Sequence, residues 1–136
     1  MGKVNIGGID YSNLKTPPEK HERGTAQYFA DRGKDVVFVC PSSIKGTHSP
    51  DFIMEGRTWE IKSPITYSNS SFEYNFKKAM KQSEHIIFDL RQLNPRNETK
   101  YIKELIKWKD KPLVRTLLVI TRDGRLLTIK GKFGNL

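Results

Sequence analysis

Cysteine is nearly absent from the sequence: Cys40 is the single thiol among 136 residues, so no intramolecular disulfide can form. The fold therefore does not depend on an oxidising compartment. No run of about 18 apolar residues occurs, and the polar N-terminus lacks the apolar core of a signal peptide, so no membrane insertion is expected. Internal repeats, low-complexity tracts and zinc-ligand spacing are absent too. The length suits one domain with a single core, and we expect residues 1–15 to form a flexible arm and residues 16–136 that domain.

Positive charge is what the sequence has in excess. It carries 24 lysines and arginines against 15 acidic residues, which gives a formal net charge of +9. Such a balance predicts a polyanionic partner, with nucleic acid ahead of an anionic membrane surface. Many small basic proteins bind nothing acidic, so charge alone does not decide. A membrane-surface protein needs an amphipathic basic helix with exposed aromatic residues, and the apolar residues of Tyr101–Trp108 are better used in a core.

Turn and capping residues predict the order of the elements. Capping boxes begin the first two helices, Thr16 with Glu19 and Ser70 with Glu73. Asp123-Gly124 is a strong signal for a two-residue hairpin turn. The expected elements are a helix over 16–32, strands over 35–40, 51–54 and 57–62, a helix over 70–82, a strand over 85–90, a helix over 97–108 and a hairpin over 113–130. This order predicts an α/β (α+β) fold in which helices pack on a sheet.

The stretch SPDFIMEGRTWEIKSP places charged side chains inside what otherwise reads as two buried strands. With a two-residue turn at Glu55-Gly56, Asp51 is expected to lie directly opposite Glu60. Opposed residues have Cβ atoms about 4.5–5.5 Å apart. Side chains alternate with a period of two, so Lys62 shares the face of the two acids. The other face is expected to be a core face, made of Phe52, Met54, Trp59 and Ile61.

Two opposed carboxylates destabilise a sheet unless something offsets their repulsion. A divalent cation such as Mg²⁺ or Mn²⁺ does so, because these ions prefer oxygen ligands. Lys62 is then placed to steady a developing charge or to help deprotonate a metal-bound water. Two other interpretations stay open at this point. The stretch can be a surface strand in which Lys62 bridges the acids, or a longer turn can change the register.

The pattern "PD", eight residues and then "EIK" resembles the PD-(D/E)xK nuclease signature. Together with "HERG…A", "KKAMKQSEHIIFDLR" and "LLVITRDGRLLTI", it resembles the C-terminal nuclease domains of contact-dependent growth inhibition (CdiA-type) toxins over roughly residues 19–130, and in particular their tRNA nuclease type. The resemblance implies a restriction-endonuclease-like mixed central sheet flanked by helices. It also implies cleavage of an RNA phosphodiester, a cognate immunity protein and action in the cytoplasm, with delivery from another cell.

The resemblance also assigns roles to residues of the hairpin. It implies that Asp51 and Glu60 bind the metal ion, that the backbone carbonyl of Ile61 joins them, and that Lys62 is the catalytic lysine. The metal is expected to be Mg²⁺, Mn²⁺ or another divalent cation.

Two helical residues complete the implied site. Glu22 matches the first-helix acid that binds the metal directly or through water, and Gln82 matches a second-helix glutamine that supports the site. The residues themselves agree for Glu22, which shares a helical face with Ala26 and Phe29. The alternative for Glu22 is a first-turn acid that complements the helix dipole. The alternative for Gln82 is an ordinary polar residue at a helix end.

Contacts to nucleic acid are expected from basic residues outside the hairpin. Phosphate contacts of this kind give salt-dependent affinity without sequence preference. The alternative for each lysine is a side chain that is simply solvated. Tyr67 can stack on a base. It can equally be a plain loop residue. The expected contacts are Lys77, Lys78, Lys81, Arg91 and His48.

The leading prediction is a metal-dependent endonuclease that hydrolyses RNA, most of all tRNA, as a toxin-type nuclease domain. A DNA endonuclease of the same fold from a mobile element is the close alternative. A non-catalytic nucleic-acid-binding module is the third, and it predicts a lost acid or lysine.

Overall fold

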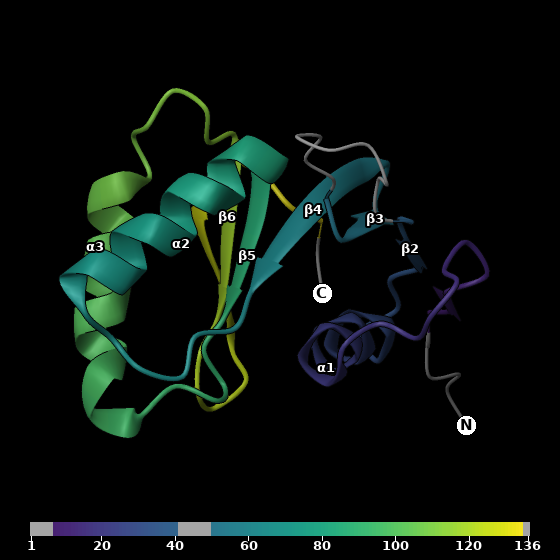
Figure 1. Ribbon diagram of the computed structural model, residues 1–136, viewed down its shortest axis with the longest axis horizontal. Coiled ribbons are helices and arrows are strands. Elements are labelled where there is room, and N and C mark those ends of the chain that lie inside the picture. The colour runs from purple at the N-terminus through teal and green to yellow at the C-terminus, as the bar shows by residue number, and fades with distance from the viewer. Residues whose placement is uncertain (1–6, 41–49, 135–136) are drawn as a thin grey trace. The chain divides into compact units, whose positions relative to one another are not determined.

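The computed structural model describes residues 7–40 and 50–134 (Figure 1). These residues fall into two compact units, one that ends at Trp59 and one over Glu60–Gly134. Strand β4, Arg57–Lys62, begins in the first unit and ends in the second. None of the described helices is long and apolar enough to cross a membrane.

The first unit combines one helix with short strands. Strand β1 pairs in parallel with β2, and β2, β3 and β4 pair antiparallel in turn. Most apolar side chains of α1 and of these strands are buried, among them Phe29, Phe52 and Trp59, whereas Ile53 of β3 is exposed. The Trp59 indole N–H donates to the Met54 carbonyl at 2.9 Å, which satisfies its buried polar atom. The elements are β1 (Ile9–Asp10), α1 (Lys20–Ala30), β2 (Val36–Phe38), β3 (Phe52–Met54) and the start of β4.

Part of the segment expected to be an arm is structured. Residues 9–10 form β1, and the Gly7 N–H donates to the Ala30 carbonyl at 2.7 Å. The backbone here lies so close to Lys34 that a Cβ at Gly7 would come 1.8 Å from the Lys34 carbonyl oxygen, so only glycine fits. The division into an arm over 1–15 and one domain over 16–136 stays a prediction.

Helix α1 begins later than its sequence predicts. Its capping box joins Glu19 and Glu22 rather than Thr16 and Glu19, so the first helical residue is Lys20. The two prolines at 17 and 18 explain the shift, because the residue before a proline is pushed into an extended conformation. Helix α2 begins at Asn69 behind a Ser68 cap, near the predicted start.

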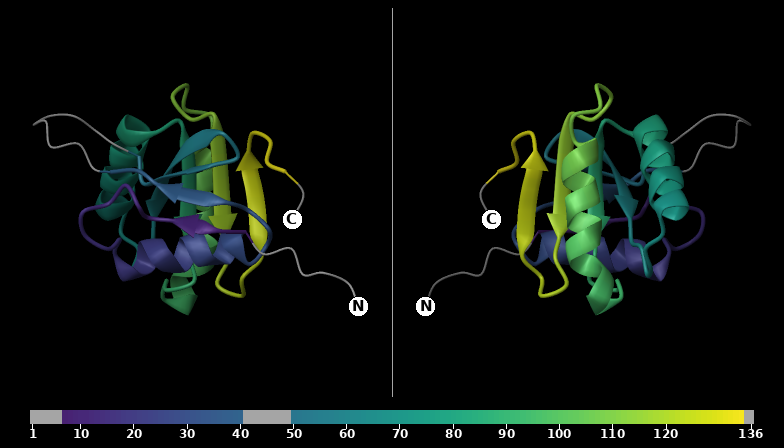
Figure 2. Two further views of the ribbon diagram at one scale, coloured as in Figure 1. Left: turned by 90° about the vertical axis from the view of Figure 1, so that its right-hand side faces the viewer. Right: turned by 90° about the vertical axis from the view of Figure 1, so that its left-hand side faces the viewer.

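The second unit is a sheet with two helices on one face. Strands β4, β5 and β6 run parallel, and β7 closes the unit antiparallel to β6. Figure 2 shows α2 and α3 beside each other on the strands of this unit. The elements are the end of β4, α2 (Asn69–Gln82), β5 (His85–Asp89), a 3₁₀ turn η1 (Pro95–Asn97), α3 (Glu98–Trp108), β6 (Thr116–Ile120) and β7 (Leu126–Lys130). A mixed sheet with three helices in the described chain confirms the predicted fold class.

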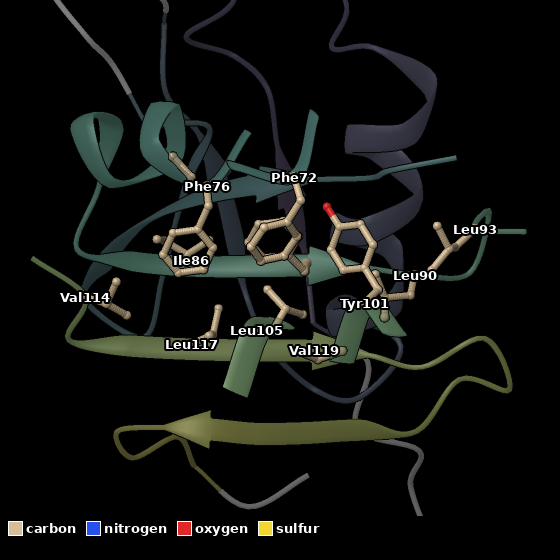
Figure 3. Close-up of a cluster of buried hydrophobic side chains, with 12 residues drawn as sticks. Phe72, Phe76, Ile86, Leu90, Leu93, Tyr101, Leu105, Val114, Leu117 and Val119 are labelled. Atoms are coloured by element: carbon tan, nitrogen blue, oxygen red, sulfur yellow. The ribbon is translucent and has the colours of Figure 1, made fainter. Parts of the chain in front are cut away.

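Stacked phenylalanines fill the space between the helices and the sheet of the second unit (Figure 3). Phe72 and Phe76 of α2 stack at 5.8 Å, and Phe76 stacks on Phe88 of β5 at 5.7 Å between ring centroids. Tyr101 of α3 meets Phe72 edge-on at 5.1 Å. Truncating one such buried ring costs about 3–5 kcal/mol. This packing fixes the position of α2, which carries the residues considered below.

Candidate active site

The hairpin of β3 and β4 has the predicted register. Met54 pairs with Arg57 and Phe52 with Trp59, as a two-residue turn requires. Both turn residues have positive φ, 53° at Glu55 and 70° at Gly56, which is typical of the hairpin turn whose twist matches the strands. The predicted core face is confirmed too, because Phe52, Met54, Trp59 and Ile61 are all buried.

Asp51 lies just before the strand ladder rather than inside it. The ladder ends at the pair Phe52–Trp59. The Asp51 N–H donates to the Trp59 carbonyl at 2.8 Å, and the Asp51 carbonyl accepts from the Val39 N–H at 3.0 Å. The expected ladder pair of Asp51 with Glu60 is therefore wrong, because the backbone of Asp51 is offset by one residue. The same two bonds fix the Asp51 backbone beside the residue that precedes Glu60 in the chain.

Glu22 and Asp51 form a carboxyl pair in the first unit. The side chains share a hydrogen bond, which requires a proton between two acids. Burial, together with the hydrogen bond and the charge of Asp51, raises the pKa of Glu22 to about 7 from its ordinary 4.5. One Glu22 oxygen also accepts from the Glu19 N–H at 3.0 Å, so this acid caps α1 as well. The structure thus brings together two of the predicted site residues.

The first turn of α1 carries a further group of ligand-type atoms. Within the described residues, atoms of Glu19, His21 and Glu22 lie within 4.8 Å of one another. His21 Nδ1 is 3.3 Å from a Glu19 oxygen, and the two glutamates form the capping box. The helix cap accounts for these contacts, so we assign no metal to this group.

A second predicted group converges in the other unit. Glu60 is 3% exposed, and the Lys62 ammonium lies 3.0 Å from its Oε2. Lys62 also donates to the Gln82 amide oxygen at 3.5 Å. Strand β4 places Glu60 and Lys62 on one face by its period of two, and α2 supplies Gln82 from its last residue. A buried carboxylate, an ammonium and an amide therefore meet. The role of the Ile61 carbonyl stays a prediction.

The basic residues expected to bind nucleic acid differ in their partners. Lys77 forms an exposed ion pair with Glu73 at 2.7 Å. Arg91 binds the Asp89 carboxylate with two nitrogens, at 3.0 and 2.8 Å. Lys78 and Lys81 are exposed and form no ion pair within the described residues. His48 lies outside the described residues.

Two tyrosines differ in exposure from what the sequence indicates. Tyr67, the tyrosine considered for base stacking, lies beside the core, and Tyr74 is the exposed one. Tyr67 meets the buried Tyr101 edge-on at 5.8 Å and packs beside the core. Tyr74 of α2 is 64% exposed instead, with the Lys78 ammonium 5.9 Å from its ring centroid. Tyr74 was not among the residues expected to contact nucleic acid, although its position off the apolar stripe and four residues before Lys78 was a usable signal.

Two comparisons with known proteins bear on this fold. A chain from a structure described as "CdiA-CT/CdiI toxin and immunity complex from Burkholderia pseudomallei" is 20% identical and superposes with a TM-score of 0.64. The alignment covers 91% of this chain and 99% of that chain, and at this identity it shows a shared fold. No curated protein matches. The family model described as "Contact-dependent growth inhibition CdiA C-terminal domain" matches residues 48–126, more than half of the chain. The chain therefore belongs to the contact-dependent growth inhibition CdiA C-terminal domain family.

Proposed function

We propose that this chain is a metal-dependent endonuclease that hydrolyses RNA phosphodiester bonds, with tRNA as the favoured substrate. The observation that carries the proposal is the convergence of the buried Glu60 carboxylate, the Lys62 ammonium and the Gln82 amide. Glu60 and Lys62 have the spacing of the PD-(D/E)xK nuclease signature, and Asp51 supplies its first acid. A non-catalytic relative would lack an acid or the lysine, whereas every position of the signature is filled here.

The donor atoms fit a hard divalent cation. Glu22 and Asp51 lie close enough to share a proton, so their oxygens are close enough to bind one ion instead. Carboxylate and carbonyl oxygens are the ligands that Mg²⁺ and Mn²⁺ prefer. We assign the metal to Asp51 and Glu60, with the Ile61 carbonyl and Glu22 as further ligands. When bound, such an ion polarises a phosphoryl oxygen and acidifies a water molecule.

Lys62 supplies the charge that the reaction needs from the protein. Its ammonium is held by Glu60 and Gln82, so it is oriented before the substrate arrives. An oriented cation stabilises the negative charge that develops on the phosphate in the transition state more than a mobile one does. Glu60 and Gln82 therefore act as positioning groups for the lysine, in addition to the role of Glu60 as a metal ligand.

The family also supports a proposal for the biological setting. We propose that the domain acts as a toxin in the cytoplasm of a cell that it enters from another cell. The similar Burkholderia structure is a complex with an immunity protein, so we propose a small cognate immunity protein for this chain as well.

The test uses total tRNA and plasmid DNA as substrates, each with Mg²⁺ or with EDTA. We expect the wild type to cleave tRNA with Mg²⁺ and not with EDTA. Glu60→Gln and Lys62→Ala should lower the rate by about a hundredfold or more, because each removes a preorganised charge. The matched control is Lys107→Ala, which removes an exposed lysine that is ion-paired on α3.

Three other results of the cleavage assay would each contradict part of the proposal. Cleavage of plasmid but not tRNA supports the DNA endonuclease instead. Binding of tRNA without any cleavage supports the non-catalytic module. If Glu60→Gln and Lys62→Ala cleave as fast as the wild type, the assigned roles are wrong.

A further inference from the structure

The second unit holds nearly all of the excess positive charge. Residues 60–134 contain 16 lysines and arginines and 8 acidic residues, so they account for +8 of the formal net charge of +9. Ion pairs engage many of these cations, including Lys62, Lys77, Arg91 and Lys107. Lys78 and Lys81 of α2 are exposed without such a partner in the described part of the chain. A polyanion that approaches this unit therefore meets several cations that no described acid pairs with, and Lys78 and Lys81 are two of them.

The outer surface of α2 is aromatic as well as basic. Phe72, Phe76 and Ala79 are buried and define the inward face. Tyr74, Lys78 and Lys81 follow each other at helical spacing on the opposite face. Tyr74 is 64% exposed, and the Lys78 ammonium lies over its ring at 5.9 Å. Exposed aromatic rings with adjacent cations are the combination that binds single-stranded nucleic acid, where a base stacks on the ring and a phosphate meets the cation.

Helix α2 also connects this surface to the candidate catalytic group. Its last residue, Gln82, contacts Lys62 at 3.5 Å. Lys78 and Gln82 are four residues apart and lie on neighbouring positions of the helix surface, about 6 Å apart along the axis. Tyr74 is about 12 Å from Gln82 by the same rise. Lys77 points to the other side of Tyr74 and is bound by Glu73. The surface that can hold RNA thus begins one helical turn from the group proposed to cleave it.

We propose that Tyr74 and Lys78, with Lys81, bind an unpaired nucleotide of the substrate RNA close to the scissile phosphate. Tyr74 stacks on the base, and the two lysines contact backbone phosphates. The inference rests on the proposed function for its substrate, and it deepens that proposal by requiring a single-stranded or looped segment next to the cleavage site. A fully paired RNA cannot offer a base to Tyr74 and is expected to bind less tightly.

Fluorescence anisotropy measures the binding of three labelled ligands: tRNA, a single-stranded RNA of about 20 nucleotides, and the duplex of that RNA. The measurement is made in EDTA, so that the proposed cleavage does not interfere. Tyr74→Ala should weaken binding of tRNA and single-stranded RNA by about tenfold, and Tyr74→Phe should keep most of the affinity because the ring remains. Lys78→Ala should lower the slope of log K against log salt by about 0.7–1. Lys77→Ala should lower it less, and Lys107→Ala is the matched control on α3. The substituted side chains are exposed, and thermal unfolding checks that each variant is folded.

The inference is overturned if Tyr74→Ala binds single-stranded RNA like the wild type, if it weakens duplex binding equally, or if Lys77→Ala lowers the slope as much as Lys78→Ala. Failure of the proposed function looks different. In that case no RNA is cleaved with Mg²⁺, while the dependence of RNA binding on Tyr74 and Lys78 persists. If the wild type cleaves RNA but none of the α2 variants changes binding, the inference fails and the proposed function stands.

Discussion

Two acids of the candidate site, Glu60 and Glu22, have their negative charge compensated in different ways. Glu60 is buried and is compensated by the Lys62 ammonium at 3.0 Å. Burial, together with the neighbouring Asp51 carboxyl group, raises the pKa of Glu22 to about 7, so this acid is compensated by a proton. A proton held in this way is released when a cation takes its place. Glu60 is thus neutralised by a side chain of the protein, whereas Glu22 is neutralised by a proton.

The shared proton makes the stability of the fold depend on pH. The folded state holds the Glu22 proton up to about pH 7, whereas a glutamate in an unfolded chain releases it near pH 4.5. Its stabilisation is fully present below about pH 4.5 and is lost as the pH rises through 7. Glu22→Gln mimics the protonated acid. In EDTA we expect this variant to be more stable than the wild type by about 1–2 kcal/mol at pH 8, after allowance for solvent screening of a half-buried group.

Urea unfolding at pH 5 and pH 8 measures this difference. At pH 5 the difference should be much smaller, because most of the loss of stabilisation falls between pH 5 and pH 7. A stability difference that is the same at both pH values would show that no proton is shared.

At the scale of the elements, the turn between β3 and β4 sets the backbone of the candidate site. Gly56 has φ of 70°, a conformation that disfavours any side chain, although a Cβ there would meet no described atom within 4 Å. Gly56→Ala is therefore expected to lower the free energy of unfolding by about 1–2 kcal/mol. The matched control is Gly24→Ala in the interior of α1, where space is also open. That change should raise the free energy by about 0.5–1 kcal/mol, because alanine favours a helix.

Thermal or urea unfolding of both variants distinguishes backbone strain from side-chain effects, since the two substitutions add the same methyl group. Destabilisation by Gly24→Ala, or no change with Gly56→Ala, would contradict this account of the turn.

The sequence predicts contacts within one element better than contacts between elements. Period-two alternation placed Glu60 and Lys62 on one face, and the Glu55-Gly56 turn predicted the register, because both depend on local backbone geometry. The Glu22–Asp51 hydrogen bond joins a helix to a segment 29 positions away in the sequence. Only the resemblance to a family linked these two acids beforehand, because the packing that brings them together has no local signal. The offset of Asp51 from the ladder had no signal either, since alternation assumes a regular strand up to its end.

At the scale of the whole chain, charge is distributed unevenly: the segment after Trp59 carries +8 of the net +9. Binding that depends on phosphate contacts releases counterions and weakens with salt. We expect the affinity for tRNA in EDTA to fall by about tenfold or more between 50 and 200 mM salt. An uncharged peptide nucleic acid of matched sequence, used as the control ligand, should bind weakly at both concentrations. Affinity that does not change with salt would mean that the excess charge plays no part in binding.

A single rigid rod, α2, carries both the exposed Tyr74–Lys78 pair and the amide that orients Lys62. In the proposed function, alignment of the ammonium and capture of a nucleotide therefore depend on one helix. Under that proposal, a molecule that binds the exposed side of α2 is expected to block the activity without contact to the buried Glu60 carboxylate.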